Sequence, residues 1–109
     1  MSWLVRDGEV LATLEVADTM SLRMAGLLGR TGIDGAMLIK PARSVHTLGM
    51  QFPIDVAFCD RNLQVLAIVC LVRNRMSRPR LRARCVIEAE AGAFERWGLK
   101  LGDRLEITG

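Results

Sequence analysis

Short apolar runs recur along the whole 109-residue sequence, and turn-forming residues separate them at close intervals. Asp7-Gly8, between the first two runs, is typical of a two-residue β-hairpin, whose turn needs positive φ at both central positions. Runs of this length, joined by tight connections, are typical of a chain built mainly from strands. The spacing therefore predicts a mainly β protein, and the length predicts a single domain over residues 1–109.

About seven strands are expected from these runs. The predicted ranges are 3–6, 9–16, 36–39, 54–59, 63–72, 78–85 and 104–107. The run at 63–72 is long and unbroken, which is typical of a central strand covered on both faces. Together these ranges predict a compact antiparallel β-sandwich or partly closed barrel with one short helix packed on one side.

That helix is expected at residues 19–28, where Asp18 or Thr19 can cap its first turn. Apolar residues then recur on one helical face, at Met20, Met24, Leu27 and Leu28, before Gly29 ends the helix. One further helical turn is expected at residues 93–97, and Gly98 ends it.

Hydrophobic residues make up 50% of the chain and Tyr is absent, so the core is expected to be aliphatic. The longest apolar run spans residues 65–72, whereas a membrane-spanning helix needs about 20 residues. Because the N-terminus also lacks the pattern of a signal peptide, we expect a soluble, cytoplasmic protein without membrane contact. Nothing in the sequence indicates the oligomeric state.

Cys59, Cys70 and Cys85 could with His46 supply four zinc ligands, but they lack the closely spaced pairs of structural zinc sites. We therefore expect reduced, buried thiols and neither a metal ion nor a cofactor.

The positive charge is concentrated in residues 73–84, which hold six arginines and no acid. Without this arginine segment the chain carries nine basic and 12 acidic residues. Four of the arginines alternate with apolar residues, which is a strand period and predicts the strand at 78–85. One hypothesis is that the segment binds nucleic acid or an acidic partner through Arg73, Arg75, Arg78, Arg80, Arg82 and Arg84. The alternative is a solvated edge strand whose charges prevent aggregation.

The stretch SVHTLGMQFPIDVAF (residues 44–58) holds the only histidine and one acid inside an apolar strand that Pro53 begins. A buried Asp55 must be hydrogen-bonded or paired. The expected partners are backbone N–H groups of residues 47–50, an arginine, or His46. Asp55 either holds this loop in place or lines a cleft together with His46.

Two functions follow from the polar residues that such a β scaffold would gather. The first is binding of a small molecule, such as a carbohydrate, by Arg30, His46, Thr47, Asp55 and Glu88. The second is an enzyme in which His46 and Asp55 form an acid–base pair. Motifs for hydrolysis, phosphoryl transfer or dinucleotide binding are absent, so binding is favoured over catalysis.

Several segments, in this order and spacing, resemble one known family. They are RMAGLLGR (23–30), GAML (35–38), HTLGMQFPIDVAF (46–58), VIEAEAG (86–92) and GDRLEI (102–107). The chain is similar in these segments to the bacterial and archaeal family known as domain of unknown function 192, and it resembles an actinobacterial-type subgroup. It departs from the family pattern at residues 46–50, where relatives usually have an aromatic-Met-Lys-Asn-Thr turn. The resemblance implies a compact, mainly β fold and no particular activity.

Overall fold

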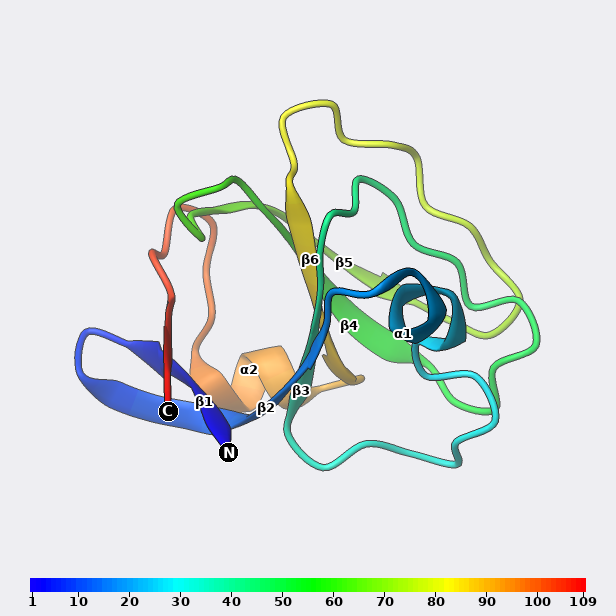
Figure 1. The fold of residues 1–109 in the computed structure, drawn as a ribbon, viewed down its shortest axis with the longest axis horizontal. Helices are drawn as coiled ribbons and strands as arrows, with labels where there is room; N and C mark the ends of the chain where they lie inside the picture. Colours follow the sequence, from blue (N-terminus) through cyan, green and yellow to red (C-terminus); the bar gives the residue numbers. More distant parts are fainter.

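The computed structural model describes all residues 1–109 and shows one twisted sheet with two short helices (Figure 1). The elements in chain order are β1 (Ser2–Arg6), β2 (Glu9–Ala17), α1 (Met20–Ala25), β3 (Ala36–Ile39), β4 (Ile54–Cys59), β5 (Val65–Leu71), β6 (Cys85–Glu90), α2 (Ala93–Trp97) and β7 (Glu106–Thr108). The seven strands lie in the order β5-β4-β6-β3-β2-β1-β7.

The prediction of a mainly β fold with about seven strands is confirmed. The sheet is mixed, because β2 and β3 run parallel whereas the other neighbours are antiparallel.

The sheet is not closed into a barrel, because its edge strands β5 and β7 do not pair with each other. The ends of the sheet still meet at one corner, through backbone bonds between residues 63–65 and 102–105. Leu105 N–H donates to the Leu63 carbonyl at 2.9 Å, and Val65 N–H donates to the Asp103 carbonyl at 2.8 Å. The sheet therefore curves around one of its two faces, where Val65 and Leu105 belong to an apolar core.

The first hairpin forms as the sequence predicts. Asp7 and Gly8 have φ of 50° and 80°, the positive values that a two-residue turn of this kind needs. The strand at 54–59 is confirmed too, and all six of its residues are buried because β4 lies between β5 and β6.

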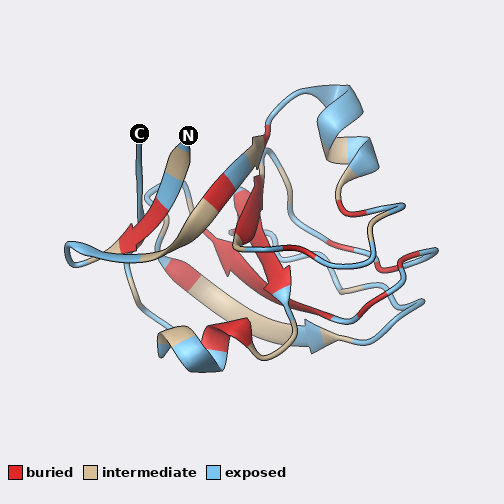
Figure 2. Cartoon of the chain, turned by 90° about the horizontal axis from the view of Figure 1, so that it is seen from below, coloured by how far each residue is buried: buried red, intermediate tan, exposed pale blue.

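Two apolar cores lie on the two faces of the sheet. α2 covers the first, in which 14 buried residues include Leu4, Ile87 and Phe94. The second core holds 12 buried residues, including Met50 and Phe58, and loops rather than regular elements cover it. Figure 2 shows the helices on opposite sides of the sheet, with α1 largely exposed. The long connections gather on the side of α1 (Figure 1).

The prediction of a central strand at residues 63–72 is wrong, because β5 is an edge strand whose residues are mostly half-buried. Each face of β5 is partly covered. Phe94 and Leu99 border one face, and Arg80 and Leu81 border the other. A strand that is half-covered on both faces carries the same unbroken apolar run as a central strand.

The strand predicted at residues 78–85 is also wrong, since β6 begins only at Cys85 and residues 73–84 form an irregular loop. Pro79 has no N–H to donate to a sheet ladder. Neighbouring N–H groups bond to another loop instead: Ser77 N–H donates to the Val45 carbonyl and Arg80 N–H to the Arg43 carbonyl, both at 2.8 Å. The alternation of arginines with apolar residues therefore does not reflect a buried strand face: Ala83 and Cys85 are buried, but Pro79 and Leu81 are exposed.

α1 is shorter than the predicted helix. The Thr19 hydroxyl caps it by accepting Leu22 N–H at 3.2 Å, but Gly26 ends it after six residues. Met20 and Met24 are 68% and 72% exposed, so the expected apolar face is not buried. α2 and Gly98 match the helical turn predicted there. Neither helix has the length and hydropathy to cross a membrane.

All three cysteines are free. Cys59 and Cys85 are opposite each other on β4 and β6 and are buried, as predicted. Cys70 is exposed, contrary to the prediction, because β5 is an edge strand.

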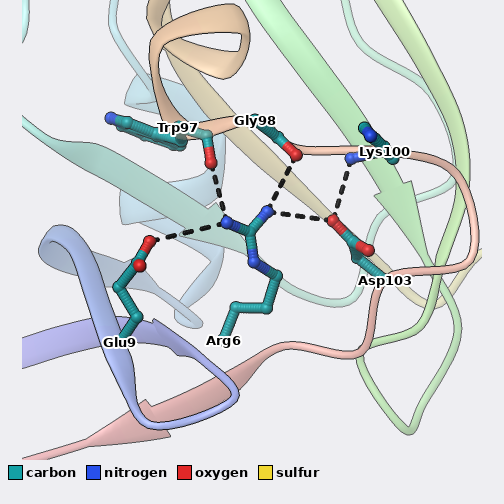
Figure 3. A network of polar contacts seen from close by, with 6 residues as sticks. All are labelled: Arg6, Glu9, Trp97, Gly98, Lys100 and Asp103. Carbon is teal, nitrogen blue, oxygen red and sulfur yellow. Dashed lines mark hydrogen bonds and ion pairs between the residues drawn. The ribbon is translucent and has the colours of Figure 1, made fainter.

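Arg6 joins the first hairpin to the segment after α2 (Figure 3). Its Nη2 donates to the Trp97 carbonyl at 2.8 Å, and its Nη1 donates to the Gly98 carbonyl at 2.9 Å and to Asp103 Oδ2 at 3.1 Å. Asp103 Oδ2 also accepts Lys100 N–H at 2.9 Å. One side chain thus joins the end of β1 to residues 97–103, in addition to the pairing of β1 with β7.

Candidate ligand-binding site

A small pocket lies beside α1, on the face of the sheet opposite α2, and we call it the α1 pocket. It has a volume of about 80 Å³, which is room for a few water molecules or one functional group of a larger ligand. The wall is mainly apolar and includes Met24, Leu27, Ile39, Val45 and Met50. The polar side chains are Arg23, Ser44, His46 and Glu88. A mainly apolar wall with a few polar groups is typical of small-molecule sites.

Glu88 lies in the middle of β6, between Met37 of β3 and Val56 of β4. The residue is only 3% exposed, and its carboxyl group has neither a hydrogen bond nor an ion pair. Burial without a partner disfavours the charged form and raises the pKa of the Glu88 carboxyl to about 7. Near neutral pH this group can therefore accept hydrogen bonds as a carboxylate or donate one as an acid.

Arg23 of α1 provides a second unsatisfied group in the α1 pocket. Its Nη1 donates to the Pro41 carbonyl at 3.2 Å, but its Nε is buried and has no partner. No ion pair joins Arg23 to Glu88. A buried N–H without a partner is rare and indicates that bound water or a ligand satisfies it. Sequence reasoning missed Arg23 as a site residue, although it belongs to the RMAGLLGR segment that carries the family resemblance.

His46 and Thr47 are neighbours with different surroundings. His46 is exposed and lines the α1 pocket. Thr47 is fully buried, and its hydroxyl donates to the Val72 carbonyl at 2.6 Å and accepts Arg75 N–H at 2.9 Å. His46 and Glu88 therefore line the same pocket, while Thr47 joins the loop at 44–50 to the arginine segment.

Asp55 lies on the opposite face of the sheet from the α1 pocket. Its Oδ2 accepts Gly92 N–H at 2.9 Å and Phe94 N–H at 3.1 Å, at the start of α2. Asp55 is 8% exposed, so the prediction of a buried, hydrogen-bonded acid is correct. The predicted donors in the turn at 47–50 are wrong. The hypothesis of an acid–base pair is also wrong, because the sheet separates His46 from Asp55.

Arg30 forms an ion pair with Glu15 of β2 through two hydrogen bonds of 2.7 and 2.9 Å. This contact lowers the pKa of the Glu15 carboxyl and raises the pKa of the Arg30 guanidinium. Arg30 does not line the α1 pocket. Of the five residues proposed from the sequence to bind a small molecule, the pocket thus unites only His46 and Glu88.

The arginine segment presents six exposed arginines, and none of them forms an ion pair. Arg73 Nε donates to the Met50 carbonyl at 2.9 Å, and Arg84 Nη1 donates to the carbonyls of Leu81 and Ala83 at 3.1 and 3.0 Å. The Arg80 guanidinium lies 5.4 Å from the centroid of the Phe58 ring. The segment is thus held against the body of the protein, with its charges uncompensated.

Comparisons with known sequences agree on one family. The model of the family DUF192, described as Uncharacterized ACR, matches residues 3–107. The UPF0127 protein PF1050 of Pyrococcus furiosus is 30% identical over 90% of this chain and 89% of its own length. The UPF0127 protein PH1112 of Pyrococcus horikoshii is 31% identical over 97% of this chain and 90% of its own length.

Two crystal structures share the fold. A protein of unknown function from Novosphingobium aromaticivorans has a TM-score of 0.79 at 20% identity, over 96% of this chain and 82% of that one. A protein from Sinorhizobium meliloti, described as a "putative transcription regulator", has a TM-score of 0.78 at 25% identity. That match covers 96% of this chain and 90% of the other.

Proposed function

The chain belongs to the uncharacterised family DUF192, and we propose that it binds a small, hydroxyl-bearing molecule of carbohydrate type in the α1 pocket. The observation that carries this proposal is the Glu88 carboxyl group, which is buried against the pocket without any partner. The carboxyl group has no partner within the protein, so a ligand in the pocket can bond to it in place of water.

Two groups of the pocket without a partner in the protein, Arg23 Nε and the Glu88 carboxyl, limit the chemistry of the ligand. Arg23 Nε–H can only donate, so the ligand must offer an acceptor. Glu88 accepts as a carboxylate and both donates and accepts as an acid. A hydroxyl group is donor and acceptor at once, so a molecule with one or two hydroxyls can satisfy both residues. His46 adds a further polar contact at the pocket.

A thermal-shift screen over polyols, sugars and organic acids tests this proposal. The wild type is compared with Glu88→Gln, which keeps the size of the side chain but cannot carry the charge. Glu90→Gln is the matched control, because Glu90 is exposed at the end of the same strand. The proposal expects a polyol or sugar that stabilises the wild type and Glu90→Gln more than Glu88→Gln. If every compound shifts the three proteins equally, the proposal is wrong.

A second candidate function is binding of nucleic acid or an acidic partner through the arginine segment. Six exposed guanidinium groups without an acidic partner favour it, because arginine pairs well with phosphate and carboxylate groups. The description of the Sinorhizobium meliloti structure as a "putative transcription regulator" is consistent with this candidate.

Salt titration of binding to a labelled single-stranded oligonucleotide tests the second candidate. Counterion release makes phosphate binding fall steeply as the salt concentration rises. The double variant Arg80→Glu/Arg82→Glu should abolish the binding, while Arg96→Glu on the far face should keep it. Affinity that is insensitive to salt, or that survives in the double variant, excludes this candidate.

A further inference from the structure

Two loops run side by side next to the α1 pocket. Ala42 N–H donates to the Arg84 carbonyl at 3.0 Å, and Arg80 N–H donates to the Arg43 carbonyl at 2.8 Å. Between them lies an open hollow of about 410 Å³ that is lined by Pro41, Ala42, Arg43 and Arg84. Backbone hydrogen bonds thus fix the relative position of the two arginines that border this hollow.

The charge around the hollow is positive and uncompensated. Residues 35–54 and 73–84, which include both loops, contain no acid. The Arg43 side chain has neither a hydrogen bond nor an ion pair. The Arg84 guanidinium is held through Nη1 by two backbone carbonyls, which leaves its Nε and Nη2 free to bind an anion. Guanidinium groups bind phosphate and carboxylate oxygens with short, directional hydrogen bonds.

Arg23 connects the hollow to the α1 pocket. It lines the pocket, and its Nη1 donates to the carbonyl of Pro41, which lines the hollow. Residues 42 and 43 of the same loop border the hollow, and residues 44–46 border the pocket. The hollow and the α1 pocket are therefore neighbours along one loop, and Arg23 touches both.

We propose that the hollow is an anion subsite and that the ligand of the α1 pocket is a hydroxyl compound that carries a phosphate group. This inference rests on the function proposed above. The hydroxyl end lies against Glu88 and Arg23, and the phosphate lies between Arg43 and Arg84. Phosphate suits this place because its terminal oxygens can accept from both guanidinium groups at once.

Isothermal titration with glycerol, glycerol 3-phosphate, glycerate and inorganic phosphate tests the subsite. We expect wild type to bind glycerol 3-phosphate at least about tenfold more tightly than glycerol. Arg43→Gln, and the double variant Arg43→Gln/Arg84→Gln, should lose that advantage. The matched double variant Arg96→Gln/Arg104→Gln, which removes the same charge from exposed positions elsewhere, should keep it. If glycerate binds as tightly as glycerol 3-phosphate, the subsite does not select phosphate and the assignment of a phosphate group is wrong.

The outcomes separate this inference from the proposed function. If phosphate compounds bind no more tightly than glycerol, or if both double variants lose affinity equally, the anion subsite is wrong even where glycerol binding depends on Glu88. If inorganic phosphate binds through Arg43 while no compound responds to Glu88→Gln, the subsite stands and the hydroxyl pocket is wrong. If the Arg84→Gln substitution unfolds the chain, the single variant Arg43→Gln still tests the subsite. The Arg43 side chain forms no hydrogen bond or ion pair within the protein, so its loss should not destabilise the fold.

Discussion

Asp55 and Glu88 lie on the neighbouring strands β4 and β6, one residue apart in register, yet their side chains project from opposite faces of the sheet. Glu88 is directly opposite Val56, so Asp55 is its diagonal neighbour. Asp55 bonds to two backbone N–H groups at the start of α2, whereas Glu88 has no partner. The two acids thus differ in their hydrogen bonds. Asp55 has a structural role, whereas the Glu88 carboxyl group is free to bind a ligand.

Asp55→Ala should destabilise the protein by about 2–4 kcal/mol, because it leaves the N–H groups of Gly92 and Phe94 without an acceptor in a buried place. Asp55→Asn should cost less, since one acceptor oxygen remains. Urea denaturation followed by circular dichroism measures both. The control is Asp34→Ala, which removes an exposed acid. If Asp55→Ala is as stable as Asp34→Ala, the two hydrogen bonds do not hold α2 in place.

Glu88 should make stability depend on pH. Its folded pKa of about 7 lies above the ordinary value of 4.5, so the folded state holds the proton more tightly than the unfolded state. The stabilising contribution is therefore complete below about pH 4.5 and is lost as the pH rises through 7. The difference of about 2.5 pKa units corresponds to about 3 kcal/mol.

Glu88→Gln removes this dependence, because its amide does not titrate. We expect the variant to be close to wild type in stability at pH 4 and more stable by about 3 kcal/mol at pH 8. Urea denaturation at both pH values measures the difference, and Glu90→Gln shows the effect of removing an exposed charge. A difference between Glu88→Gln and wild type that is the same at both pH values would contradict the pKa assigned to Glu88.

Local signals in the sequence were enough for the hairpin at Asp7-Gly8, the buried strand at residues 54–59 and the helical turn at 93–97. Each depends on residues close in the chain, such as a turn pair or a terminating glycine. The edge position of β5 and the loop at 73–84 depend on what packs against them from distant parts of the chain. No local pattern contains that information. The unbroken apolar run therefore predicts a central strand at 63–72 wrongly, and the period of two predicts a strand at 78–85 wrongly.

The site was predictable only in part for the same reason. The sequence predicts Asp55 as a buried acid, but its donors come from the start of α2, almost forty residues later in the chain. The sequence also proposes His46 and Glu88 as site residues, but strand alternation alone cannot show that they lie on one face of the sheet and Asp55 on the other. Arg23 stands in the RMAGLLGR segment that carries the family resemblance, but its buried Nε without a partner is visible only in the structure.

Arg30→Met should leave ligand binding unchanged, because Arg30 pairs with Glu15 and does not line the α1 pocket. The pair is partly exposed, with side chains 38% and 49% accessible, so its loss should cost less than about 1 kcal/mol. Urea denaturation and the thermal-shift screen used for Glu88→Gln measure both effects. A strong loss of ligand response in Arg30→Met would show that the pocket extends beyond the residues described above.

Arg6 should be sensitive even to a change that keeps its charge. Its guanidinium donates to Trp97, Gly98 and Asp103 from two nitrogens, and a single ammonium group cannot reproduce that geometry. Arg6→Lys and Arg6→Met should therefore both destabilise the protein, by about 1–3 kcal/mol. Amide hydrogen exchange should become faster in β1 and in residues 97–103, but not in β4. Wild-type exchange rates in Arg6→Lys would show that the several hydrogen bonds of the guanidinium do not stabilise the contact between β1 and residues 97–103.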